Sequence, residues 1–88
     1  PLVLFEAMSY GLPVISSNAG GISEIIKHRQ NGILLKKRDL SYLLIHVKEL
    51  IQNNELYKSI STNARKEIKT NYTTKQMYQN IYNLISKI

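Results

Sequence analysis

The tripeptide Gly11-Leu12-Pro13 restricts the fold of this chain more than any other feature of its sequence. Glycine is a common residue just past the end of a helix, and proline bars helix continuation and holds the residue before it extended. The apolar residues before Gly11 therefore predict a helix over residues 1–10, opened by a proline. The β-branched stretch at residues 14–17 predicts a short buried strand directly after this break.

The same alternation continues along the next part of the chain. Residues 18–21 predict a turn, residues 23–28 a short helix, and Asn31-Gly32 a second turn that leads into a strand at residues 33–35. The order helix, strand, helix, strand implies parallel strands joined by right-handed crossovers. The expected fold class is therefore α/β, the C-terminal part of a Rossmann-like domain with short parallel strands.

A helical tail, residues 38–88, is expected to follow the α/β part, residues 1–37. Asp39 can cap its first helix, and Asn53-Asn54 breaks the pattern before a second helix. Thr73 with Gln76 forms a capping box for a last helix. Apolar residues at helical spacing predict the buried faces. They are Leu40, Leu43, Leu44, Val47, Leu50 and Ile51 in the first helix, Leu56, Ile60, Ala64 and Ile68 in the second, and Met77, Ile81, Leu84, Ile85 and Ile88 in the last.

Two observations predict that this chain is part of a longer protein. Two strands alone do not form a stable sheet. The chain also opens inside an apolar element, at Pro1, without an initiator methionine. We therefore expect missing sheet upstream, and an exposed sheet edge that can favour oligomers.

Composition narrows the choice of partners. The net charge is +6, which can attract phosphates, nucleic acid or an anionic membrane, although a solvated lysine-rich surface explains it equally simply. The basic triplet Lys36-Lys37-Arg38 either contacts a phosphate or a lipid headgroup, or is simply a solvated loop. Cysteine is absent, which excludes disulfides and thiolate metal sites and fits a reducing compartment. The sequence also predicts neither a signal peptide nor a transmembrane helix.

The start of the first predicted helix is a candidate binding site. The first N–H groups of a helix have no internal partner, and those of Leu2 and Val3 can bind a diphosphate without a basic side chain. Glu6 lies one turn further on, where its carboxylate can accept two hydrogen bonds from a ribose diol. An alternative is that Glu6 only complements the helix dipole.

A second candidate lies after the first predicted strand. Gly20-Gly21 follows its carboxyl end, the edge at which open α/β sheets bind ligands. The two glycines either let the backbone approach a ligand or simply satisfy a turn with positive φ. Glu24 is either a ligand contact or a dipole partner. His28 and His46 are far apart in sequence and have no further ligand at metal spacing, so no metal site is expected.

Read together, these residues resemble the donor-binding motif of the retaining glycosyltransferases of family four, which have the GT-B fold. The family pattern is E-A-M-A-x-G-x-P-V-I-A-(S/T)-x-x-G-G-x-x-E-I-I, followed by N-G-x-L. The residues in register with it are Glu6, Ala7, Met8, Gly11, Pro13, Val14, Ile15, Gly20, Gly21, Glu24, Asn31 and Gly32. The resemblance covers nearly the whole chain.

The resemblance implies a nucleotide-sugar donor held between two Rossmann-like domains, and sugar transfer with retention. It assigns the ribose hydroxyls to Glu6, as the second glutamate of an E-x7-E pair, and the diphosphate to the backbone of Leu2 and Val3. Dipoles and basic groups would stabilise the leaving diphosphate, so neither a metal nor a cofactor is expected. The first glutamate, the basic pair and the acceptor domain of the family lie outside this chain, and Thr74 stands where the family often has tryptophan.

We therefore expect a glycosyltransferase of bacterial polysaccharide or glycolipid synthesis, with this chain inactive on its own. A nucleotide-sugar epimerase of the same fold and a non-catalytic interaction module are the alternatives. The expected partners are a nucleotide sugar, an N-terminal domain and a membrane surface, not nucleic acid. The expected location is the cytoplasm, at the inner face of the membrane.

Overall fold

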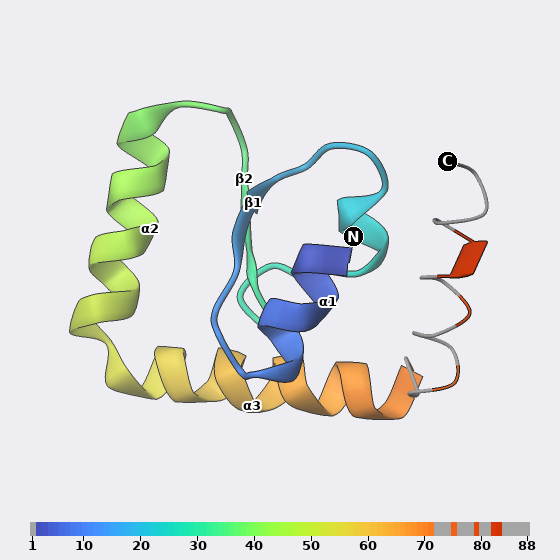
Figure 1. Ribbon diagram of the computed structural model, residues 1–88. Coiled ribbons are helices and arrows are strands. Elements are labelled where there is room, and N and C mark those ends of the chain that lie inside the picture. Colours follow the sequence, from blue (N-terminus) through green and yellow to red (C-terminus); the bar gives the residue numbers. More distant parts are fainter. Residues whose placement is uncertain (1, 72–74, 76–78, 80–81, 84–88) are drawn as a thin grey trace.

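The computed structural model describes residues 2–71, 75, 79, 82 and 83, and Figure 1 shows their arrangement. The elements are α1 (Leu2–Ser9), β1 (Ile15–Ser17), the 3-10 helix η1 (Ile22–Glu24), β2 (Ile33–Leu35), α2 (Leu40–Gln52) and α3 (Asn54–Asn71). The capping box and the inward face predicted for a last helix lie outside the described residues.

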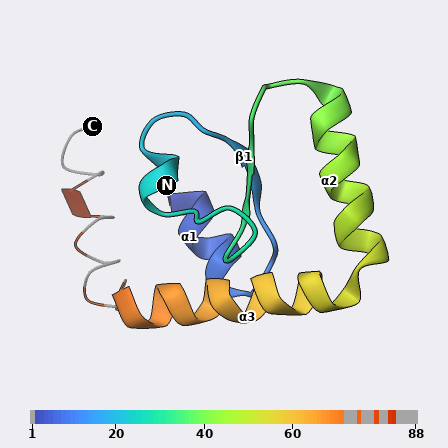
Figure 2. The ribbon, with the colours of Figure 1, turned by 180° about the vertical axis from the view of Figure 1, so that it is seen from behind.

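The two strands pair in parallel, as the alternation of elements predicted. Ile15 lies opposite Ile33, and Ser17 lies opposite Leu35. In Figures 1 and 2, α1 and α2 flank the strands on opposite sides, and α3 runs across one end of all three. The α/β class expected from the sequence is therefore the class observed.

Each face of the small sheet has its own core cluster. Val14 and Leu34 pack into a cluster with α1 and α3, which contains the fully buried Met8. Ile15 and Ile33 point to the other face, where they meet α2 and α3. The successive residues of a strand face opposite sides of a sheet, so each strand contributes to both cores. The predicted inward stripe of α3 is confirmed, with Ile60, Ala64 and Ile68 buried and Leu56 half-buried.

The end of α1 is fixed by a Schellman motif. The N–H of Leu12 donates to the carbonyl of Ala7 at 3.0 Å, and the N–H of Gly11 donates to the carbonyl of Met8 at 2.9 Å. This motif requires a left-handed residue, and Gly11 has a φ of +72°. The glycine also sits against α3, which leaves no space for a side chain.

The helix predicted over residues 23–28 is wrong in extent. Only a single 3-10 turn, η1, forms there. The side chain of Asn31 takes over the backbone groups that a longer helix would use, because it accepts from the N–H of Lys27 at 2.7 Å and donates to the carbonyl of Ile25 at 3.1 Å. Ile26 can then enter the core, where it is 1% exposed.

The bounds of α2 match the expectation, but its predicted buried face is only partly buried. Asp39 accepts from the N–H of Ser41 at 2.9 Å as the expected cap, and the helix ends before Asn53. Of the six predicted core residues of α2, Leu50 is buried and two are half-buried, whereas Leu40, Leu44 and Ile51 are 67%, 56% and 78% exposed. The apolar face of α2 is therefore wider than the part that β2 and α3 cover.

We predict that Gly11→Ala lowers the free energy of unfolding by about 1–3 kcal/mol. The alanine would have to adopt the left-handed backbone conformation of Gly11. Its Cβ would lie 2.7 Å from Ser61 Oγ and 2.5 Å from Arg65 Nε. Gly20→Ala is the matched control, because its φ is also positive but a Cβ added there would meet no heavy atom within 4 Å. It should cost only about 1 kcal/mol. Urea unfolding monitored by circular dichroism measures both values, and equal losses would contradict the steric part of this explanation.

Candidate functional site

The candidate site lies at the edge of the sheet where the strands end. Both strands run in the same direction, so Ser17 of β1 and Leu35 of β2 finish at one edge. In both ribbon views the start of α1 lies beside η1 at this end (Figures 1 and 2). Apolar contacts hold α1 and η1 together, because Ile22 and Ile25 pack against the cluster that contains Leu4. The fold therefore brings together the start of α1 and the glycine loop, which the sequence analysis treated as two separate candidates.

The first turn of α1 presents backbone donors next to an unpaired carboxylate. Leu2 and Val3 begin the helix, so their N–H groups have no acceptor one turn earlier. Glu6 is exposed, and its side chain makes no hydrogen bond or ion pair with any residue in the described part of the chain. Only its backbone is engaged locally, since the Glu6 carbonyl accepts from Ser9 Oγ at 2.7 Å and from the N–H of Tyr10 at 3.3 Å. The carboxylate of Glu6 is thus available to an external ligand.

The glycine loop has both a positive φ and a backbone that is open to approach, the two alternatives that the sequence analysis gave for Gly20 and Gly21. Gly20 and Gly21 have φ values of +55° and +80°, so each needs a residue that tolerates the left-handed region. A Cβ at either position would also meet no atom of the protein within 4 Å, so the loop faces open space. Its shape is held by backbone hydrogen bonds from Ile22 to Ala19 and from Glu24 to Gly21. Glu24 is exposed at the end of η1.

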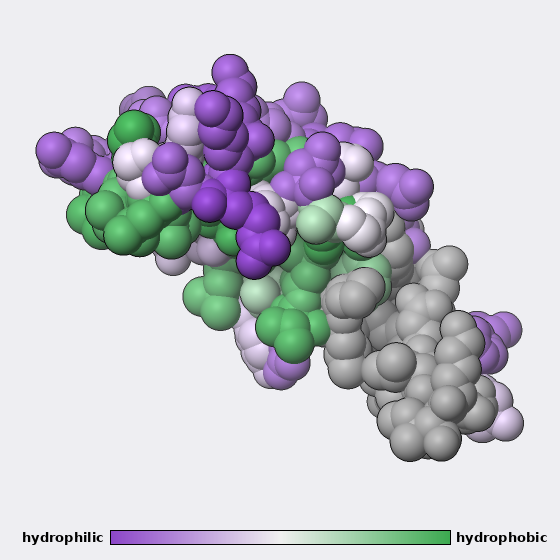
Figure 3. Space-filling model, turned by 90° about the horizontal axis from the view of Figure 1, so that it is seen from above, coloured by the Kyte–Doolittle hydropathy of each residue, from purple (hydrophilic) through white to green (hydrophobic). Residues whose placement is uncertain are grey.

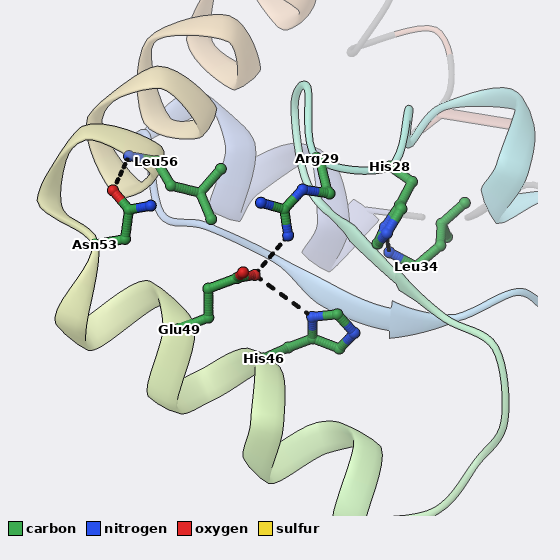
Figure 4. A network of polar contacts seen from close by, with 7 residues as sticks. All are labelled: His28, Arg29, Leu34, His46, Glu49, Asn53 and Leu56. Atoms are coloured by element: carbon green, nitrogen blue, oxygen red, sulfur yellow. Dashed lines mark hydrogen bonds and ion pairs between the residues drawn. The ribbon is translucent and has the colours of Figure 1, made fainter.

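A second cluster, which the sequence analysis missed, joins the loop before β2 to α2 (Figure 4). The guanidinium of Arg29 donates to Glu49 Oε1 at 2.6 Å, and His46 Nδ1 lies 3.8 Å from the same oxygen. The rings of His28 and His46 meet edge to face, with centroids 5.8 Å apart. The N–H of Leu34 donates to His28 Nδ1 at 3.1 Å. The sequence separation of these residues hid the contact, because only the folded chain brings α2 against this loop.

The cluster shifts the pKa of two of its members. Burial is the main cause that lowers the pKa of His28, and the neighbouring His46 and Arg29 lower it further. The hydrogen bond from Arg29 lowers the pKa of the Glu49 carboxyl. Arg29 itself has a φ of +66°, an uncommon conformation for a residue with a side chain. The described residues contain no group of three His, Cys, Asp or Glu side chains that could hold a metal ion.

The comparisons with known proteins agree with this architecture. Residues 1–67 match the family model of glycosyl transferases group 1, and the chain belongs to this family. It is 30% identical over its whole length to the amylovoran biosynthesis glycosyltransferase AmsK of Erwinia amylovora, covering 22% of that protein. The C-terminal domain of the group 1 glycosyl transferase LpcC of Francisella tularensis superposes with a TM-score of 0.72, at 28% identity over 80% of this chain and 36% of that chain.

A further solved structure contains a nucleotide. HepE of Anabaena in complex with UDP has a TM-score of 0.79 and 27% identity, and the match covers 98% of this chain and 24% of that one. The chain spans about a fifth of the length of the curated relatives it matches. Family and structural neighbours together identify the fold as that of the C-terminal domain of GT-B glycosyltransferases, so the predicted resemblance to GT-B glycosyltransferases is confirmed.

No helix in the described part of the chain is both long and apolar enough to serve as a membrane span.

We predict that acidification destabilises the chain in two steps. The pKa of His28 in the folded state lies below its ordinary 6.5, so the unfolded state binds the proton more tightly, and stability falls as the pH drops from 6.5 towards the folded value. The pKa of Glu49 lies below 4.5, so the stability it contributes is present above 4.5 and is lost as the pH falls through its folded value.

Urea unfolding across this pH range measures both steps. His28→Asn keeps an acceptor near the position of Nδ1 but does not titrate, so it should remove the first decline and leave the second. Retention of the first decline in this variant would assign it to another group.

Proposed function

We propose that this chain supplies the ribose- and diphosphate-binding half of the donor site in a retaining glycosyltransferase. The observation that carries the proposal is the exposed carboxylate of Glu6, one turn from the start of α1 and without a partner among the described residues. The backbone N–H groups of Leu2 and Val3 provide donors for a diphosphate at that helix end. Gly20 and Gly21 leave open space on the same side of the sheet.

The proposed chemistry uses mostly the backbone. N–H groups and the helix dipole stabilise negative charge where the nucleoside diphosphate leaves, and they do so without rearranging during the reaction. The Glu6 carboxylate fixes the ribose by accepting from two hydroxyls, which orients the sugar-bearing phosphate. Similarity to HepE, whose structure contains UDP, supports a nucleotide as the ligand. Because the dipole and the N–H groups supply the charge stabilisation here, the proposal includes no metal.

The proposed acceptor is a growing bacterial polysaccharide or glycolipid. The similarity to AmsK, a glycosyltransferase of amylovoran biosynthesis, supports this choice. The acceptor pocket, the first glutamate of the E-x7-E pair and the basic pair of the family have no counterpart within the 88 residues. The transferase reaction therefore depends on residues that this chain does not contain.

We expect Glu6→Gln to weaken UDP binding by the complete protein that carries this chain roughly 10- to 100-fold, because hydrogen bonds to a charged group contribute about 1.5–3 kcal/mol. Isothermal titration calorimetry with UDP and 2′-deoxy-UDP measures the effect. If Glu6 binds the ribose diol, the loss must shrink for the deoxy nucleotide, which lacks one of the two donors.

Glu55→Gln is the control, since Glu55 is an exposed glutamate in the first turn of α3 and lies away from the site. If Glu6 only complements the dipole of α1, Glu6→Gln would lower stability by about 0.3–1 kcal/mol and leave nucleotide affinity at the wild-type value. Parallel titrations with GDP and ADP identify the preferred base.

The isolated 88-residue chain is predicted to show no sugar transfer. Radiolabelled UDP-glucose, incubated with the isolated chain and with the complete protein, provides the measurement, with product formation by the complete protein as the positive control. Transfer by the isolated chain would show that the catalytic groups are all present within these residues.

A further inference from the structure

We propose that the outer side of α2 and the basic loop before it form a docking surface for an anionic lipid membrane. The surface consists of the loop residues Lys36, Lys37 and Arg38, the helix residues Leu40, Leu44 and Ile51, and Lys48. It goes beyond nucleotide binding, because it uses a different helix and different side chains from the candidate donor site. The membrane-docking surface and the proposed donor site do not depend on each other.

The apolar part of this surface is a single exposed stripe. At 100° per residue, Leu40, Leu44 and Ile51 fall within an arc of about 40° on α2. They are 67%, 56% and 78% exposed, so more than half of each side chain is in contact with water. In the view from above, hydrophobic residues gather over α2 beside a group of hydrophilic ones (Figure 3). An exposed apolar stripe of this kind fits a partner that is itself apolar.

The charges around the stripe select the kind of partner. The three basic residues of the loop directly precede the first turn of α2, and Lys48 follows Leu44 by one turn. All four are exposed, and none forms an ion pair with a carboxylate within the part of the chain that the structure describes. Basic residues that border exposed leucines are the pattern of a helix that lies at an anionic lipid interface.

The acidic residues of this segment offset only part of that charge, because Asp39 is one carboxylate beside the four basic residues of the surface. Asp39 is used as the cap of α2, accepting from both the N–H and the hydroxyl of Ser41. Glu49 lies on the opposite side of α2 from the stripe and is bound to Arg29 at 2.6 Å. The surface is therefore positive as well as apolar, and a bilayer that contains acidic headgroups matches both properties. No described helix is long and apolar enough to span a bilayer, so the contact would be peripheral.

Co-sedimentation of the complete protein that carries this chain tests the proposal. We expect binding to vesicles of phosphatidylcholine with phosphatidylglycerol, little binding to phosphatidylcholine alone, and weaker binding at high salt. Replacing the three basic residues of the loop by Gln should lower the partition coefficient on the order of 100-fold, since each basic residue near such a surface contributes roughly fivefold.

Two matched controls separate this surface from general charge and general hydrophobicity. Replacing Lys58, Lys66 and Lys69 of α3 by Gln removes the same charge from a different helix and should leave binding close to wild type; Figure 1 shows that α3 crosses the end of the strands opposite the basic loop. Leu44→Gln should weaken binding, whereas Leu12→Gln, which changes a leucine of similar 53% exposure near α3, should not. UDP titration of each variant checks that the fold and the donor site are intact.

Three results would overturn the proposal. Equal binding to neutral and anionic vesicles would remove the charge argument. Equal loss in the loop variant and the α3 variant would show that net charge alone is responsible. If Leu44→Gln lowers the free energy of unfolding and leaves vesicle binding unchanged, the stripe packs against protein instead of lipid. If the wild-type protein does not bind UDP, the result counts against the proposed donor site only. The vesicle results still test the docking surface.

Discussion

The burial of one stripe of α3 against both faces of the sheet is the interaction on which the rest of the structure depends. Two strands of three residues do not hold together alone. Ile60 joins the core on the α2 side, whereas Ala64 and Ile68 join the core on the α1 side. Each fully buried aliphatic side chain of the size of isoleucine stabilises the fold by roughly 1.5–3 kcal/mol. A single helix therefore connects the two halves of the core and holds the strands in register.

This arrangement leaves the opposite end of the strands open for binding. Because α3 crosses the end at which α1 stops, it does not cover the start of α1 or the glycine loop at the other end (Figure 1). Gly11 makes this possible by letting the chain turn tightly against Ser61 and Arg65. The candidate donor site consequently consists of backbone groups, one carboxylate and a loop with two adjacent glycines. Such a site depends on accurate placement of the backbone, and the packing of α3 provides that placement.

Most of the fold could be predicted because its determinants are local. Gly11 and Pro13 separate α1 from β1, Asp39 caps α2, and the spacing of apolar residues in α3 matches its buried stripe. The predictions failed where a distant residue decided the outcome. The side chain of Asn31 forms hydrogen bonds with backbone groups after η1 and so ends the helix early. The exposure of Leu40 depends on how much of the α2 surface the neighbouring elements cover. Periodicity indicates which face of a helix is apolar, but not how much of that face a neighbour covers.

The sequence by itself determined the order of the elements, the α/β class and the motif that contains Glu6, Gly20 and Gly21, because turns, caps and periodicity act over a few residues. Only the tertiary structure decided that Arg29 pairs with Glu49, and that the ring of His28 meets that of His46. It also decided which side of α2 presents leucines next to a basic loop. These contacts join residues far apart in the chain, and their geometry exists only once the strands have paired and the helices have packed on them.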